Sequence, residues 1–74
     1  MENKTTQEPT AKYQVGDRLV YNFILPKDGA YAAEDIFTVT EVSFFKGMAK
    51  YQMDTAKGPR VMYESAVLRE LKQI

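Results

Sequence analysis

The chain has 74 residues, ten Lys and Arg against ten Asp and Glu, and neither Cys nor His. A chain of this length forms one domain at most and buries only about 60 to 65% of its unfolded surface, so its core is thin. The composition excludes disulfides and the usual nitrogen and sulfur metal ligands. The balanced charge also disfavours nucleic acid as the partner, because binding to phosphates needs a basic excess. Oligomerisation is then the remaining common way to bury more surface.

The first residues are polar and include Pro9. Because they bury too little apolar surface to offset the cost of ordering, we expect a disordered tail over residues 1–11 and a single domain over 12–74. The tail has no apolar run typical of a signal peptide, and no later stretch reaches the roughly 20 apolar residues that cross a membrane. We therefore expect a cytoplasmic protein with no membrane partner.

The first strand is predicted at residues 18–25, after the turn formed by Val15, Gly16 and Asp17. Both of its faces carry apolar residues, so it is expected to be covered on both faces or to lie at an interface. Residues 26–29 end it by turn chemistry, and a loop follows.

Three further strands are predicted from alternation and β-branched content, at residues 36–42, 48–54 and 59–63. Turns at 43–47 and 55–58 join them as hairpins. The strand over 48–54 alternates so regularly that one of its faces is expected to lie in water.

The segment after residue 63 has two interpretations. Val67, Leu68, Leu71 and Ile74 recur at helical spacing, with Ser65 as an acceptable N-cap. We favour a single turn at 64–67 and a closing strand from Leu68, because a barrel needs a fifth strand to cover its first. The core is then expected to contain the following apolar residues: Leu19, Phe23, Val39, Tyr51, Met53, Val61 and Leu68.

Residues 13–71 resemble the SH3-like barrel superfamily, in which a Gly-Asp start and a short turn before the last strand recur. The resemblance implies an all-β, five-stranded SH3-like barrel with a short helical turn before the last strand. Peptide-binding SH3 domains grip proline-rich ligands with a Trp, and this chain contains none. Polyproline recognition is therefore not expected.

Two narrower resemblances imply particular functions. The run Tyr-Gln-Val-Gly-Asp-Arg-Leu-Val-Tyr at 13–21 is similar to the start of the Tudor-like domain of CarD-type transcription factors, which implies binding to RNA polymerase or nucleic acid. Residues 60–68 resemble the Val-Gln-Ile-Tyr and Ala-Leu segments of type II dihydrofolate reductase, an oligomer with a central pore. That likeness implies that Val61, Met62 and Tyr63 face a pore or ligand, with Val61 replacing the family's Gln and Tyr63 retained.

Catalytic chemistry has few candidates in this composition. With no His or Cys, only carboxylates, Lys and Tyr remain, and Asp17, Glu34 and Asp35 all lie at predicted turns, where acids bond backbone amides or water. We therefore assign no catalytic residue, no cofactor and no metal. Four acids and no base lie within residues 28–41, and four bases against one acid within 44–60, a pattern that suits a dipolar surface or two ordinary solvated faces.

Phe44 and Phe45 give the clearest indication of a binding surface. Neighbouring residues on a strand point to opposite faces, so only one Phe is expected to enter the core. With Lys46 and Lys50 nearby, the other Phe favours protein contact, with simple core packing and base stacking as the alternatives. Tyr31, in the long loop, offers an apolar ring and a hydroxyl for hydrogen bonding, and we include it among the candidate partner-binding residues.

The sequence thus predicts a non-catalytic protein-binding module that is homo-oligomeric, and chain size and style favour a bacterium, phage or mobile element as its source. The partner set is Phe44, Phe45, Lys46, Lys50 and Tyr31. Three alternatives stay open: a type II dihydrofolate reductase-like oligomer, a transcription-associated Tudor-like module, and a small-molecule or nucleotide binder.

Overall fold

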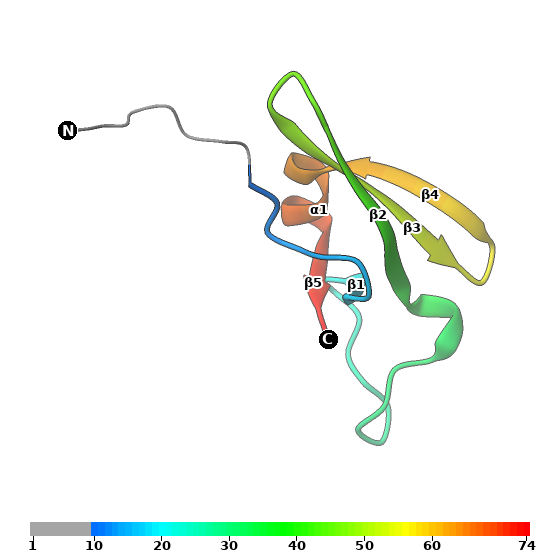
Figure 1. Ribbon diagram of the computed structural model, residues 1–74. Coiled ribbons are helices and arrows are strands. Elements are labelled where there is room, and N and C mark those ends of the chain that lie inside the picture. The colour runs from blue at the N-terminus through cyan, green and yellow to red at the C-terminus, as the bar shows by residue number, and fades with distance from the viewer. Residues whose placement is uncertain (1–9) are drawn as a thin grey trace.

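The computed structural model describes residues 10–74, which form an antiparallel sheet with a short helix before the last strand (Figure 1). The strands are β1 (Arg18–Tyr21), β2 (Phe37–Phe45), β3 (Met48–Thr55), β4 (Gly58–Tyr63) and β5 (Leu71–Gln73), with a 3-10 helix η1 (Ala33–Asp35) and the helix α1 (Glu64–Glu70). The strand order is β4-β3-β2-β1-β5, so the sheet is open and β4 and β5 are its edges. The predicted all-β class, with five strands and a helical segment before the last, is confirmed.

The β2–β3 hairpin is the longest feature of the sheet, and its tip projects beyond α1 (Figure 1). Its turn contains only Lys46 and Gly47, with φ of 53° and 80°. Two consecutive positive φ angles are typical of a type I′ turn, whose twist matches that of the paired strands, and Gly adopts this conformation without a Cβ clash. The tight turn places Phe45 directly opposite Met48.

One face of the sheet carries the core, against which α1 and the segment before β1 pack. The buried cluster comprises Tyr13, Leu19, Phe37, Val39, Ala49, Tyr51, Met53, Val67 and Leu71. Val20 points to the opposite face from Leu19 and is also fully buried. The expectation that the first strand is covered on both faces is therefore confirmed at this position.

The first strand is shorter than predicted, because Asn22 bonds to the end of α1. Its backbone N–H donates to the Glu70 carbonyl (2.8 Å) and its side-chain amide to the Arg69 carbonyl (2.7 Å). The chain turns away from β2 there, so Phe23 is 73% exposed and is not a core residue as predicted. These bonds satisfy carbonyls that a helix end leaves without partners.

The C-terminal segment combines both interpretations. The helix α1 is longer than the predicted single turn, and β5 begins at Leu71 rather than at Leu68, which is 48% exposed and lies outside the core. The N-cap is Tyr63, without a side-chain cap, and not Ser65. Helical spacing correctly placed Val67 and Leu71 toward the core, and the need to cover β1 correctly predicted β5, which pairs with it.

The segment just before β1 contacts the core. Ala11 packs against the core and Tyr13 is buried within it, so the segment just before β1 belongs to the fold. Of the predicted tail over 1–11, residues 1–9 lie outside the described residues. No helix in the described part of the chain is long and apolar enough to cross a membrane.

Candidate functional site

The face of the sheet opposite the core collects exposed apolar side chains at the end nearest the β2–β3 turn. Register places Phe45 opposite Met48, Lys50 opposite Tyr63 and Gln52 opposite Val61. Because the strands alternate, all these side chains point away from the face that buries Ala49, Tyr51 and Met53. The four apolar members are exposed: Phe45 at 50%, Met48 at 43%, Val61 at 56% and Tyr63 at 38%.

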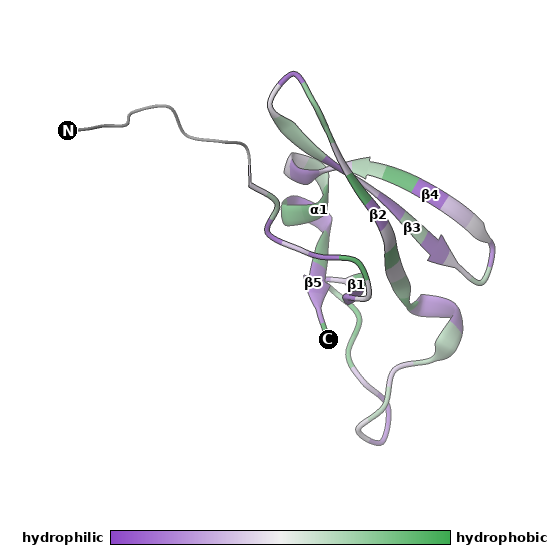
Figure 2. Cartoon of the chain, in the orientation of Figure 1, coloured by the Kyte–Doolittle hydropathy of each residue, from purple (hydrophilic) through white to green (hydrophobic). Residues whose placement is uncertain are grey.

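The aromatic members contact one another. The Phe45 and Tyr63 ring centroids lie 6.3 Å apart at 70°, an edge-to-face pair that spans β2 and β4. The Lys46 ammonium lies 5.4 Å from the Phe45 ring centroid. We call the set of Phe45, Lys46, Met48, Lys50, Val61 and Tyr63 the outer patch. Figure 2 shows apolar stretches where β2 nears its turn and where β4 approaches α1.

The chemistry of the outer patch suits contact with another macromolecule. Aromatic and Met side chains are enriched at the centres of protein interfaces, and an ammonium over a ring adds attraction of about 0.5 to 1 kcal/mol at an exposed site. The patch lies toward a hairpin tip and contains two lysines and no acid. It therefore has the composition of a docking surface rather than of a reaction centre.

Five of the predicted site residues thus lie together: Phe45, Lys46, Lys50, Val61 and Tyr63. Phe44 lies on the opposite face, across from Ala49, and is 46% exposed, so neither adjacent Phe is buried as we had expected for one of them. The hairpin extends past the elements that cover the core, which leaves Phe44 partly in water. Sequence reasoning missed Met48, although the two-residue turn pairs it with Phe45.

The remaining two predicted residues lie elsewhere. Met62 is half-buried against the core and does not share the face of its neighbours Val61 and Tyr63. Tyr31 lies in the loop before η1, with the Lys72 ammonium 6.0 Å from its ring centroid. Lys72 belongs to β5, at the opposite edge of the sheet from β4, so Tyr31 is separate from the outer patch.

A partly buried hydrogen-bond network ties the start of the domain to β3 and α1. The Tyr51 hydroxyl donates to Glu64 Oε1 (2.5 Å) and accepts from the Tyr13 N–H (3.1 Å), and the Lys12 N–H donates to the same Glu64 oxygen (2.9 Å). Burial and the bond to Glu64 raise the pKa of Tyr51 to about 12. The hydroxyl therefore stays protonated at neutral pH, and the network fixes structure rather than moving protons.

The three acids considered from the sequence, Asp17, Glu34 and Asp35, lie in a turn or beside basic residues. Asp17 accepts a bond from the Gln14 N–H (2.9 Å) within the turn before β1. Glu34 and Asp35 line a hollow of about 120 Å³ together with Lys57 and Arg60. Side chains from the acidic run and from the basic run of the sequence thus line the same hollow. The two kinds of charge are not separated onto two faces there.

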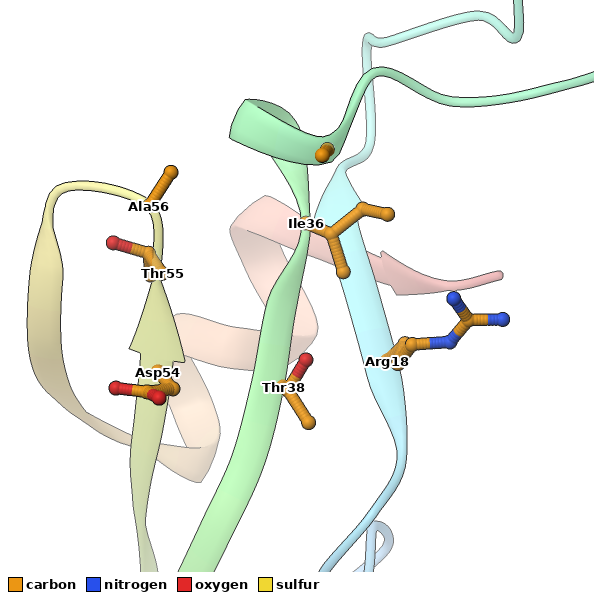
Figure 3. Close-up of a pocket in the computed structure, with 7 residues that line it drawn as sticks. Arg18, Ile36, Thr38, Asp54, Thr55 and Ala56 are labelled. Atoms are coloured by element: carbon orange, nitrogen blue, oxygen red, sulfur yellow. The ribbon is translucent and has the colours of Figure 1, made fainter.

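A hollow of about 340 Å³ lies over the other end of the sheet and is wide open to solvent (Figure 3). Arg18, Thr38 and Asp54 form one row across β1, β2 and β3, and Figure 3 shows Arg18 pointing away from Asp54. Within residues 10–74, no group of three or more acidic side chains is placed to hold a metal ion. These hollows offer no enclosed site for a cofactor.

No protein-family profile, no curated protein and no solved structure matches this chain. The run at residues 13–21, from which we expected a Tudor-like module, contributes to the fold here, since Tyr13 and Leu19 are buried and the Gly16 N–H donates to the Val39 carbonyl (2.8 Å). Its residues are used in packing and turns, so the outer patch is the best-supported candidate site.

Proposed function

We propose that this chain is a non-catalytic protein-binding module that works as a homo-oligomer and makes its contacts through the outer patch. The observation that carries the proposal is the exposed Phe45–Tyr63 ring pair, flanked by Met48 and Lys46 on an otherwise regular sheet face. A surface aromatic that a partner covers contributes on the order of 1.5 to 3 kcal/mol, whereas an exposed ion pair contributes under about 1 kcal/mol. The rings should therefore dominate the affinity.

The relationship to SH3-like barrels belongs to this proposal. Its support is the strand order β4-β3-β2-β1-β5 together with a short helix between β4 and β5, the connection that the resemblance implies. The sheet is open, and folds of this size host many functions, so the function depends on the surface that the fold presents.

Site-specific photo-crosslinking tests the proposed surface. A benzophenone amino acid replaces Phe45 in the outer patch or, as the matched control, Phe23, which is 73% exposed in the loop after β1. Each labelled protein is irradiated alone and in extract of its own host. We expect covalent adducts, with itself or with another protein, from position 45 and few from position 23.

A melting curve of each labelled protein keeps the test interpretable, because both positions are exposed and neither replacement should lower the melting temperature by more than a few degrees. Equal adduct yields at the two positions, or none at position 45, would refute the proposed surface. The reductase alternative has its own assay, protein-dependent oxidation of a reduced nicotinamide cofactor with dihydrofolate. We expect no turnover, because Val61 lacks the polar groups of the Gln that it replaces.

A further inference from the structure

The outward-facing backbone groups of the edge strand β4 are complementary to those of a second copy of the same strand. It pairs with β3 and with no other strand of the described chain, and Pro59 lies opposite Asp54. Proline has no N–H, so this pair must be a non-hydrogen-bonded one, with the Pro59 nitrogen directed away from β3. By alternation, the N–H and C=O groups of Val61 and Tyr63 also point away from β3. The outer edge of β4 thus presents the donors of Val61 and Tyr63.

From this pattern we infer that the β4 edge beside the outer patch binds a second copy of this chain, whose β4 pairs antiparallel with the first across a two-fold axis at Val61. This inference rests on the proposed homo-oligomer, because it names the strand through which two copies meet. In this register Val61 of each copy donates to Val61 of the other, and each Tyr63 N–H donates to the Pro59 carbonyl of the other copy.

The register leaves no backbone group at this edge without a partner. Pro59 cannot donate to the Tyr63 carbonyl of the second copy, which would be a defect in most sheet pairings. Tyr63 is the N-cap of α1, however, and the carbonyl of an N-cap residue already accepts the first bond of its helix. The position where Pro59 lacks an N–H therefore faces the Tyr63 carbonyl of the other copy, which is already occupied within its own chain. A partner strand of arbitrary sequence would not have this match.

The outer-face side chains of β4 agree with the same two-fold pairing. On the outer face, Val61 lies against Val61 of the second copy, and the Tyr63 ring against the Pro59 ring. The two outer patches then lie side by side on one face of a continuous sheet.

A charge-swap experiment tests this register, because Val61 lies opposite itself. Val61→Lys and Val61→Glu are made in the full chain and analysed by sedimentation equilibrium over a concentration series, separately and as an equimolar mixture. We expect a concentration-dependent dimer for the unmodified chain, association weakened by roughly tenfold or more for each variant alone, and recovery in the mixture. Val61 is 56% exposed in the single chain, so at concentrations where every protein is monomeric both variants should keep the melting temperature of the unmodified chain.

A backbone variant separates hydrogen bonding from charge. Val61→Pro removes the two central donors of the dimer while leaving the β3 ladder intact, since this N–H does not face β3. It should weaken association roughly fivefold to a hundredfold, and the matched Val61→Ala, which keeps the donor, should weaken it less.

Three outcomes would overturn the inference: an unmodified chain that stays monomeric, charge variants that each associate as well as it does, or a mixture that does not recover. The crosslinking result separates this failure from that of the proposed function. A monomeric chain whose position 45 still crosslinks to a different protein would overturn the second copy and leave the outer patch as a binding surface.

Discussion

Replacing Tyr51 by Phe should remove a large share of the stability of this domain. The Tyr51 ring is fully buried, and Phe preserves its packing, so the change isolates the hydroxyl. That hydroxyl accepts from the Tyr13 N–H and donates to the Glu64 carboxylate. Leaving a buried N–H without a partner costs about 1 to 3 kcal/mol, and a hydrogen bond to a charged group contributes about 1.5 to 3 kcal/mol, less where water can replace it.

Together these losses predict a destabilisation of about 2 to 4 kcal/mol. A chain of 74 residues is expected to have a total stability of roughly 4 to 11 kcal/mol, so the effect is easily measured. Urea unfolding followed by circular dichroism should show a lower midpoint with an unchanged slope. The matched control is Tyr63→Phe, which removes the hydroxyl of a 38% exposed ring and should cost under about 0.5 kcal/mol.

A double-mutant cycle with Glu64→Gln tests whether the two groups act as one network. The network predicts a coupling energy of about 0.5 kcal/mol or more between the two positions, because they share one hydrogen bond. A loss under about 0.5 kcal/mol for Tyr51→Phe, or additive single effects, would refute the reasoning.

Two further predictions concern pH and the core. Burial and the bond to Glu64 raise the pKa of Tyr51 from 10.0 to about 12, so the native state holds this proton more tightly than the unfolded chain. Its stabilising contribution should therefore be complete below about pH 10 and be lost as the pH rises to about 12. Alkaline urea titrations should show this loss, and Tyr51→Phe should reduce it; equal pH dependence in both proteins would contradict the assignment. Val39→Ala should cost about 1 to 3 kcal/mol, because Val39 is buried at the centre of the sheet, and a loss near zero would place it outside the core.

The sequence was sufficient to predict the sheet because alternation survives wherever one face is buried and the other lies in water. Residues 48–54 show this most clearly, since Ala49, Tyr51 and Met53 are all buried as the pattern requires. Element ends were harder to predict. Nothing local in Phe23 indicates that the preceding Asn22 bonds to the end of a helix 47 residues away and ends the strand there.

The candidate surface was predicted in part for a related physical reason. Phe45, Lys46 and Lys50 are close in sequence, so one hairpin brings them together. Tyr63 joins them only through the pairing of β3 with β4, and the resemblance to a reductase selected it for a different role. Tyr31 was chosen by residue type alone, and the fold places it near β5, at the other edge of the sheet.

The most direct test of the contact surface is an amide NMR spectrum of the isotope-labelled chain recorded from micromolar to millimolar concentration. The β4 edge and the outer patch should respond together, so we expect concentration-dependent shifts at the amides of Val61, Tyr63 and Phe45. The amides of Phe23 and Tyr31, which lie away from this edge, should not move. Shifts centred on Tyr31, or spectra that do not change with concentration, would contradict the account.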